Sequence, residues 1–203
     1  MVSLSRLCFA GISAAILTAS IGCGKKFEIR DVDPGRPGTV RNLGPESQDA
    51  IQLSDQLTRS LLSSRASSQW TTPPTIVLYE FSNNTRHAFS GEVFSSRLKV
   101  ELARNADGRI MFVARDMWDA IVRERELKRS GQADYDPNLR SQAQAGGDYF
   151  LKGRADGLAA VSTKGQSDYI LYTYKLVDAE TGIEVWEDSF ETKREGRDDV
   201  IYR

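Results

Sequence analysis

The sequence predicts a single α/β (α+β) domain, built on one mixed β-sheet with about four helices packed against it. Three runs rich in β-branched and aromatic residues follow one another near the C-terminus, at 149–155, 169–177 and 183–190, separated by segments with glycine, serine, aspartate and threonine. Upstream, stretches with apolar residues at helical spacing alternate with short apolar runs. The three C-terminal runs are therefore predicted to form an antiparallel meander that the helices cover.

The middle run, 169–177, is apolar on both of its alternating faces, as expected for a central strand. One of these faces consists of Ile170, Tyr172, Tyr174 and Leu176. The segment that follows, 178–182, predicts a type I turn in which Asp178 bonds the turn backbone and Gly182 takes a left-handed conformation.

The first 22 residues have the character of a secretory signal. Arg6 is the only charged residue among them, and the apolar run at 7–17 is too short to span a bilayer comfortably. Gly22 directly before Cys23 resembles the bacterial lipoprotein signal, in which the cysteine is lipidated and becomes the mature N-terminus. The alternative is an ordinary secretory signal with an incidental cysteine. We predict a signal peptide over 1–22, lipidation at Cys23 and, through the acyl chains, attachment to a membrane.

Residues 23–48 are predicted to form the lipidated N-terminus and a flexible tether, because 24–48 contain three prolines, four glycines and few apolar positions. The globular domain is predicted over 49–203, with a first helix that begins near Ser47 and buries Leu53, Leu57 and Leu61. The remaining elements are expected as a strand at 75–80, a loop at 83–87, a helix capped by Ser90, a strand at 110–113, a helix from Asp116 that turns Trp118, Ile121 and Val122 inward, and a short helix after Asp136 and Pro137.

The chain offers few groups for catalysis. His87 is its single histidine, which excludes multi-histidine metal sites, and neither a Gly-x-Ser-x-Gly motif nor a phosphate or dinucleotide loop is present. A net charge of −1 argues against a broad nucleic-acid surface. We predict a protein that is not an enzyme, with no catalytic residue, metal site or cofactor. The competing enzyme hypothesis rests on His87 with Asp107 or Ser90.

Two groups of residues are candidates for partner binding. The loop residues Asn83, Asn84, Thr85 and His87 are polar, follow a predicted strand and have no evident role in the core. Tyr172 and Tyr174 belong to the residue types that dominate interface hot spots. Core packing explains these two tyrosines equally well, and the sequence does not separate the two roles.

The chain resembles the LpoB family of peptidoglycan-synthase activators over about 50–193. The resemblance is carried by residues 76–78, 83–87, 147–151, 176–182 and 185–186, in order behind a lipoprotein-like signal. It implies a fold akin to the N-terminal domain of TolB, a lipid-anchored location on the periplasmic face of the outer membrane, and activation of a bifunctional penicillin-binding protein. The tether, about 25 residues, is far shorter than the proline-rich tethers of relatives that reach across the periplasm. The alternative is a non-catalytic role in envelope assembly or secretion, as in the related folds of CsgG and TolB.

Overall fold

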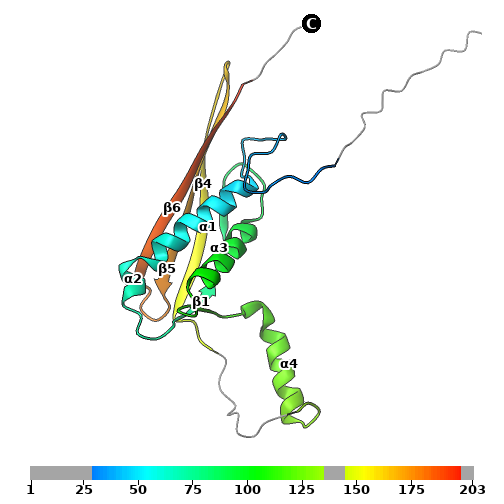
Figure 1. Cartoon of the computed structure of the whole chain (residues 1–203), viewed down its shortest axis with the longest axis vertical. Helices are drawn as coiled ribbons and strands as arrows, with labels where there is room; N and C mark the ends of the chain where they lie inside the picture. The colour runs from blue at the N-terminus through cyan, green and yellow to red at the C-terminus, as the bar shows by residue number, and fades with distance from the viewer. Residues whose placement is uncertain (1–28, 135–144, 198–203) are drawn as a thin grey trace, which may run out of the picture. The chain divides into compact units, whose positions relative to one another are not determined.

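The computed structural model describes residues 29–134 and 145–197. Within these ranges one mixed sheet is combined with helices, as the sequence predicts, and the structure has six strands and four α-helices there (Figure 1). The elements in chain order are α1 (Ser47–Leu62), α2 (Arg65–Ser68), β1 (Thr75–Leu78), β2 (Ser82–Asn84), α3 (Gly91–Asn105), β3 (Met111–Phe112), the 3-10 turn η1 (Arg115–Met117), α4 (Trp118–Arg129), β4 (Tyr149–Ser162), β5 (Gly165–Asp178) and β6 (Glu184–Gly196).

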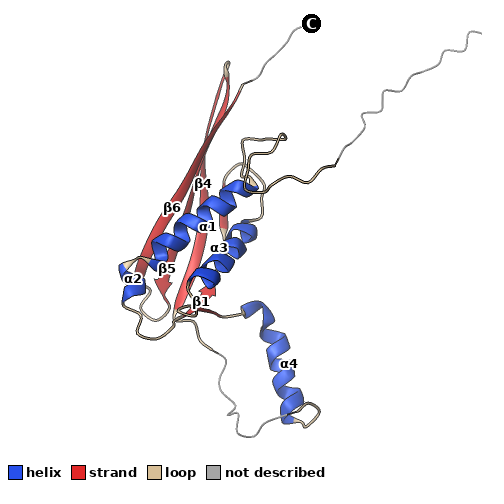
Figure 2. Ribbon diagram, viewed as in Figure 1, coloured by secondary structure: helices blue, strands red, loops and turns tan. Residues whose placement is uncertain are grey.

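The sheet is mixed, with strand order β3-β1-β4-β5-β6. β1 runs parallel to β3 and to β4, whereas β4, β5 and β6 form the predicted antiparallel meander (Figure 2). β2 adds a short parallel pairing farther along β4, where Asn83 lies opposite Ala155. β5 is thus the central strand of the meander, and β4 is the strand on which the parallel and antiparallel halves meet.

β4 and β5 are longer than the sequence pattern indicates. The predicted runs leave a gap over 156–168, but the structure continues both strands through it and joins them by a turn at Thr163 and Lys164. Residues 157–164 are all exposed to solvent. A strand that is exposed on both faces needs no alternation of apolar and polar residues. The hydrophobic pattern therefore ends where the helices no longer cover the sheet.

One face of the sheet forms the core. Ile170, Tyr172, Tyr174 and Leu176 of β5 are buried on this face, and the apolar sides of α1 and α3 pack over it. The helix residues that cover the strands are Leu53, Leu57, Leu61, Phe94, Leu98 and Leu102. Burying each such side chain contributes about 1.5–3 kcal/mol relative to leaving it exposed. This layer of two helices on one sheet face is the source of the domain's stability.

The turn between β5 and β6 has the predicted geometry. The Asp178 carboxylate accepts hydrogen bonds from the backbone N–H groups of Glu180 at 3.0 Å and Thr181 at 2.7 Å. These bonds hold the pKa of Asp178 below its usual value. Gly182 has φ +71°, a left-handed conformation that side chains disfavour. The turn fixes the register of the meander at this end.

The folded unit begins before the predicted boundary at residue 48. Glu46, and not Ser47, caps α1, in a reciprocal capping box in which the Glu46 N–H donates to Asp49 at 2.8 Å. The Ser47 hydroxyl instead donates to the Pro34 carbonyl at 2.7 Å. Gly44 is buried, and the compact unit begins at Val32. A large part of the predicted tether therefore belongs to the domain.

Helix α4 forms where a helix is expected. The prediction that Trp118, Ile121 and Val122 turn inward to the core is wrong. Trp118 is 43% exposed, Val122 is 38% exposed, and α4 buries no residue. The Arg115 guanidinium lies 5.4 Å from the centre of the Trp118 ring, which shields this aromatic by a cation–π contact. The short helix predicted after Asp136 lies outside the described residues.

Candidate partner-binding surface

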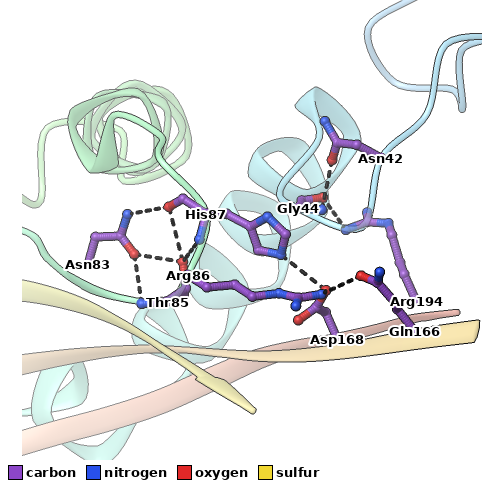
Figure 3. Close-up of polar contacts among 9 residues, drawn as sticks. All are labelled: Asn42, Gly44, Asn83, Thr85, Arg86, His87, Gln166, Asp168 and Arg194. Carbon is purple, nitrogen blue, oxygen red and sulfur yellow. Dashed lines mark hydrogen bonds and ion pairs between the residues drawn. The ribbon is translucent and has the colours of Figure 1, made fainter. Parts of the chain in front are cut away.

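The segment after β2 is a tightly hydrogen-bonded loop (Figure 3). The Asn83 side chain accepts hydrogen bonds from the Thr85 N–H at 3.0 Å and the Thr85 hydroxyl at 2.8 Å, and its amide donates to the His87 carbonyl at 2.9 Å. From the sequence, these polar side chains are expected to contact a binding partner. In the structure they bond to one another, so they define the shape of the loop.

The loop is fastened to β5 through Asp168. The Asp168 carboxylate is buried, forms an ion pair with Arg86, and lies 3.3 Å from His87 Nε2 (Figure 3). The His87 ring also packs against the Gly44 backbone so closely that a Cβ there would come within 2.9 Å of two ring atoms. His87 is consequently a structural residue that joins the loop, β5 and the segment before α1.

Asn84 differs from its neighbours in the loop. It lies in β2, which pairs with β4, so the predicted loop is partly a strand. Its amide donates to the Asp156 carboxylate at 2.9 Å, and both side chains lie at the surface of the sheet. β2 has no apolar side chain in its three residues, so hydrophobic periodicity gives no signal for it.

The candidate catalytic residues do not form a common site. Ser90 precedes α3 and Asp107 follows it, and a helix of 15 residues separates them by about 22 Å. The carboxylate that lies 3.3 Å from His87 Nε2 is that of Asp168. In the described ranges no group of three or more histidine, cysteine, aspartate or glutamate residues is placed to hold a metal ion. No described helix is long and apolar enough to cross a membrane.

Tyr172 and Tyr174 are core residues, which corrects their assignment as partner contacts. Both are fully buried. Tyr172 stacks on Phe94 of α3 with ring centres 5.1 Å apart, and the Tyr174 hydroxyl forms a 3.1 Å hydrogen bond with Ser95 of the same helix. Burial raises the pKa of both phenols above the ordinary value. Neither side chain is available to a partner in this structure.

The opposite face of the meander carries the exposed side chains of the same strands, and we call it the open face. Because side chains alternate along a strand, the neighbours of Tyr172 and Tyr174 point to this side. None of the described helices packs on it, since α1 and α3 contact the other face. The open face consists of Phe150, Lys152, Arg154 and Asp156 of β4, Leu171, Thr173, Lys175 and Val177 of β5, and Glu184, Glu187, Ser189 and Glu191 of β6.

The charges on the open face are largely sorted by strand, apart from the Asp156 carboxylate of β4, which lies 2.6 Å from the Arg154 guanidinium. Lys152, Arg154 and Lys175 place positive charge on β4 and β5, around a hollow that Thr173 also lines. Glu187 of β6 also lines this hollow, and the Lys175 ammonium donates to Glu184 at 3.0 Å. That bond lowers the pKa of Glu184, whereas a hydrogen bond with Glu184 raises the pKa of Glu187. The surface therefore offers a partner a basic side and an acidic side.

Apolar groups lie within this charged frame. Leu171 and Thr173 are half-buried in the centre of the sheet. At the β1 side, Phe150 is 37% exposed and meets the Tyr79 ring edge-on at 5.9 Å, and the Lys152 ammonium lies 5.7 Å from the same ring. Aromatic and aliphatic side chains ringed by charges are typical of a protein-binding surface.

Comparison with known proteins gives a family and several similar solved structures. A family model described as peptidoglycan-synthase activator LpoB matches residues 48–192. The LpoB C-terminal domain from Salmonella enterica matches with 17% identity, 71% of this chain and 98% of that chain covered, and a TM-score of 0.46. The corresponding Escherichia coli domain matches with 15% identity, the same coverage and 0.45. The NMR structure of E. coli LpoB covers 96% of this chain and 94% of that one, with 15% identity and 0.42. No curated protein sequence matched.

Proposed function

Because the chain belongs to the LpoB family of peptidoglycan-synthase activators, we propose that it binds a bifunctional penicillin-binding protein through the open face and favours that enzyme's active conformation. An activator can raise the rate only as far as it binds the active conformation better than the inactive one. The protein itself performs no chemistry in this proposal. It regulates cell-wall synthesis by binding alone.

The observation that supports the open face as the binding surface is its combination of exposure and composition. It is a broad strand surface free of helices in the described ranges, with the basic residues on β4 and β5, most acidic residues on β6, Leu171 in its centre and Phe150 at its β1 side. Asn84 and Asp156 border it, so one predicted contact residue keeps its place in the proposal. Thr173 and Leu171 take the place of Tyr172 and Tyr174, one residue away on the same strand.

We further propose that the domain stays close to the membrane that anchors it. Anchoring rests on the predicted lipidation of Cys23, and the location on the periplasmic face of the outer membrane is that implied by the family. The chain is already bonded to the domain at Pro34. The eleven residues that follow Cys23, from Gly24 to Pro34, reach at most about 40 Å when fully extended. The synthase must therefore extend toward the anchored domain.

Purified chain added in excess to its cognate synthase tests the proposal. The rate of glycan polymerisation or of peptide cross-linking should rise and saturate with the concentration of the chain, and the chain alone should turn over no substrate. If the synthase neither binds the chain nor changes its rate, the chain acts elsewhere in the envelope, as in the alternative assembly or secretion role.

A further inference from the structure

Lys152 of β4 is a cation of the open face that has no carboxylate partner. Its side chain is half-buried, and its ammonium lies 5.7 Å from the centre of the Tyr79 ring. In the described ranges no ion pair involves Lys152. The ring holds the ammonium in place at the surface, but it does not neutralise the charge.

The other two cations of this surface are neutralised within the chain. The Lys175 ammonium donates to Glu184 at 3.0 Å. The Arg154 guanidinium lies 2.6 Å from the Asp156 carboxylate. In the described part of the open face, the positive charge that lacks a partner is therefore that of Lys152, at the β4 side of the hollow that all three cations line.

The register of the sheet places Lys152 where a cation is unfavourable in the free chain. Lys152 lies directly opposite Lys175 in the pairing of β4 with β5. Side chains in directly opposite positions have Cβ atoms about 5 Å apart, and like charges there destabilise a sheet. Residues that lower stability in this way are characteristic of binding sites. The repulsion is relieved when a carboxylate from outside the chain enters the hollow.

The acidic residues of the surface leave the β4 side of the hollow open to an anion. Glu187 lines the hollow from β6, opposite Lys175. Two strand spacings separate β6 from β4, so Glu187 lies about 10 Å across the sheet from Lys152. Asp156 lies four residues farther along β4, about 13 Å from Lys152. An incoming carboxylate at Lys152 therefore meets positive charge first.

We propose that an aspartate or glutamate side chain of the synthase inserts beside Lys152, which makes Lys152 the residue of the open face that selects this partner. The inference rests on the proposed function, because it takes the synthase as the occupant of the open face. The rings of Tyr79 and Phe150 border the position, and Thr173 lines the hollow from β5. Once the partner covers these groups, the ion pair is shielded from water and becomes stronger.

Affinity measurements on variants of the full chain test the role of Lys152. Lys152→Met keeps an unbranched apolar side chain but removes the charge, and it should weaken binding of the synthase about tenfold or more. Lys152→Arg retains the charge and should keep most of the affinity. Lys99→Met is the matched control, because the half-buried Lys99 of α3 also places its ammonium 5.7 Å from the centre of an aromatic ring, that of Phe112. It should bind as the wild type does.

Stability and salt dependence separate this role from a structural one. Because Lys152→Met removes a like charge opposite Lys175, the melting temperature of the free chain should not fall. The affinity of the wild type should decrease with rising salt more steeply than that of Lys152→Met, since salt screens the ion pair. A lower melting temperature with unchanged affinity would show that Lys152 serves the sheet, and would overturn the proposal.

Carbodiimide cross-linking of the complex identifies the carboxylate. The reagent joins an amine to a carboxylate that is in contact with it, so mass spectrometry should find Lys152 linked to an aspartate or glutamate of the synthase. Lys152→Arg should lose this link while it keeps its affinity. If the wild type and Lys152→Met bind the synthase equally well, this inference fails and the proposed function stands. If the wild type does not bind the synthase, the proposed function fails, and the inference with it.

Discussion

The Arg194 guanidinium of β6 holds the Asp49 carboxylate of α1 at both oxygens, at 2.6 and 2.8 Å. Both side chains are largely buried, with 12% and 3% exposed. The second terminal nitrogen of Arg194 donates to the Gly44 carbonyl at 2.8 Å (Figure 3). One arginine thus joins the edge of the sheet, the first turn of α1 and the segment before it.

Replacing Arg194 by methionine should lower the free energy of unfolding by about 3 kcal/mol, because the buried Asp49 carboxylate loses its counter-charge. Urea denaturation followed by circular dichroism measures the loss. Lys193→Met, on the same strand but exposed, should change stability by about 0.5 kcal/mol or less. Equal effects of the two substitutions would show that the buried pair does not stabilise the domain.

The loop should prove structural. Asn83→Ala removes three hydrogen bonds within the loop, and we expect it to cost about 1 kcal/mol and to increase hydrogen exchange at Thr85 and His87. From the sequence alone, alanine at Asn83, Thr85 and His87 would be expected to leave stability nearly unchanged. Gln52→Ala, on the exposed side of α1, is the control. If Asn83→Ala is as stable as the control, the loop bonds contribute nothing.

Alkaline pH should destabilise the domain through its buried tyrosines. Burial raises the pKa of Tyr174 above 10.0 in the folded state, so its contribution is complete below pH 10.0 and is lost as the pH rises above it. Tyr172 acts in the same direction. Tyr174→Phe should cost about 1 kcal/mol near neutral pH, since Ser95 loses its partner. Denaturation at several alkaline pH values should show a smaller loss for this variant, and an equal loss would contradict the assignment.

The sequence predicts the parts of the fold that depend on the spacing of apolar and polar residues or on a turn glycine. The meander, the buried faces of α1 and α3, and the turn at Gly182 all follow from apolar spacing or from a glycine conformation. Those features that backbone pairing controls were not predictable in this way. β2 is polar, the far half of β4 is exposed on both sides, and the contacts of Gly44 and Asp168 depend on residues distant in sequence.

The binding surface illustrates the same limit. The alternation along β5 identifies two faces, but it does not say which face the helices cover. Both faces carry apolar residues, with tyrosines on one and Leu171 and Val177 on the other. The helices α1 and α3 decide between them by packing on Tyr172 and Tyr174. The partly exposed residues of that strand, Leu171 and Thr173, therefore lie one position away from the tyrosines.

Lipid anchoring remains a prediction from the sequence, because Cys23 lies outside the described residues. Cys23→Ala should abolish metabolic labelling with palmitate and release the chain from membranes, since two or three acyl chains hold a protein far more firmly than one. Cys8→Ala should leave both properties unchanged, because that cysteine lies in the predicted signal peptide. Continued labelling of Cys23→Ala would show that the anchor is elsewhere.

The most direct test of the account is the affinity of the synthase for an open-face variant. Thr173→Glu places a charge in the centre of the open face, whereas Gln52→Glu adds the same charge on α1, which packs on the other face. Both sites tolerate a polar side chain, so both variants should keep the wild-type stability within about 0.5 kcal/mol. We predict that Thr173→Glu weakens binding at least tenfold and shifts the stimulation curve to higher concentration, with Gln52→Glu unchanged. Full affinity and full stimulation by Thr173→Glu would contradict the proposal that the open face binds the synthase.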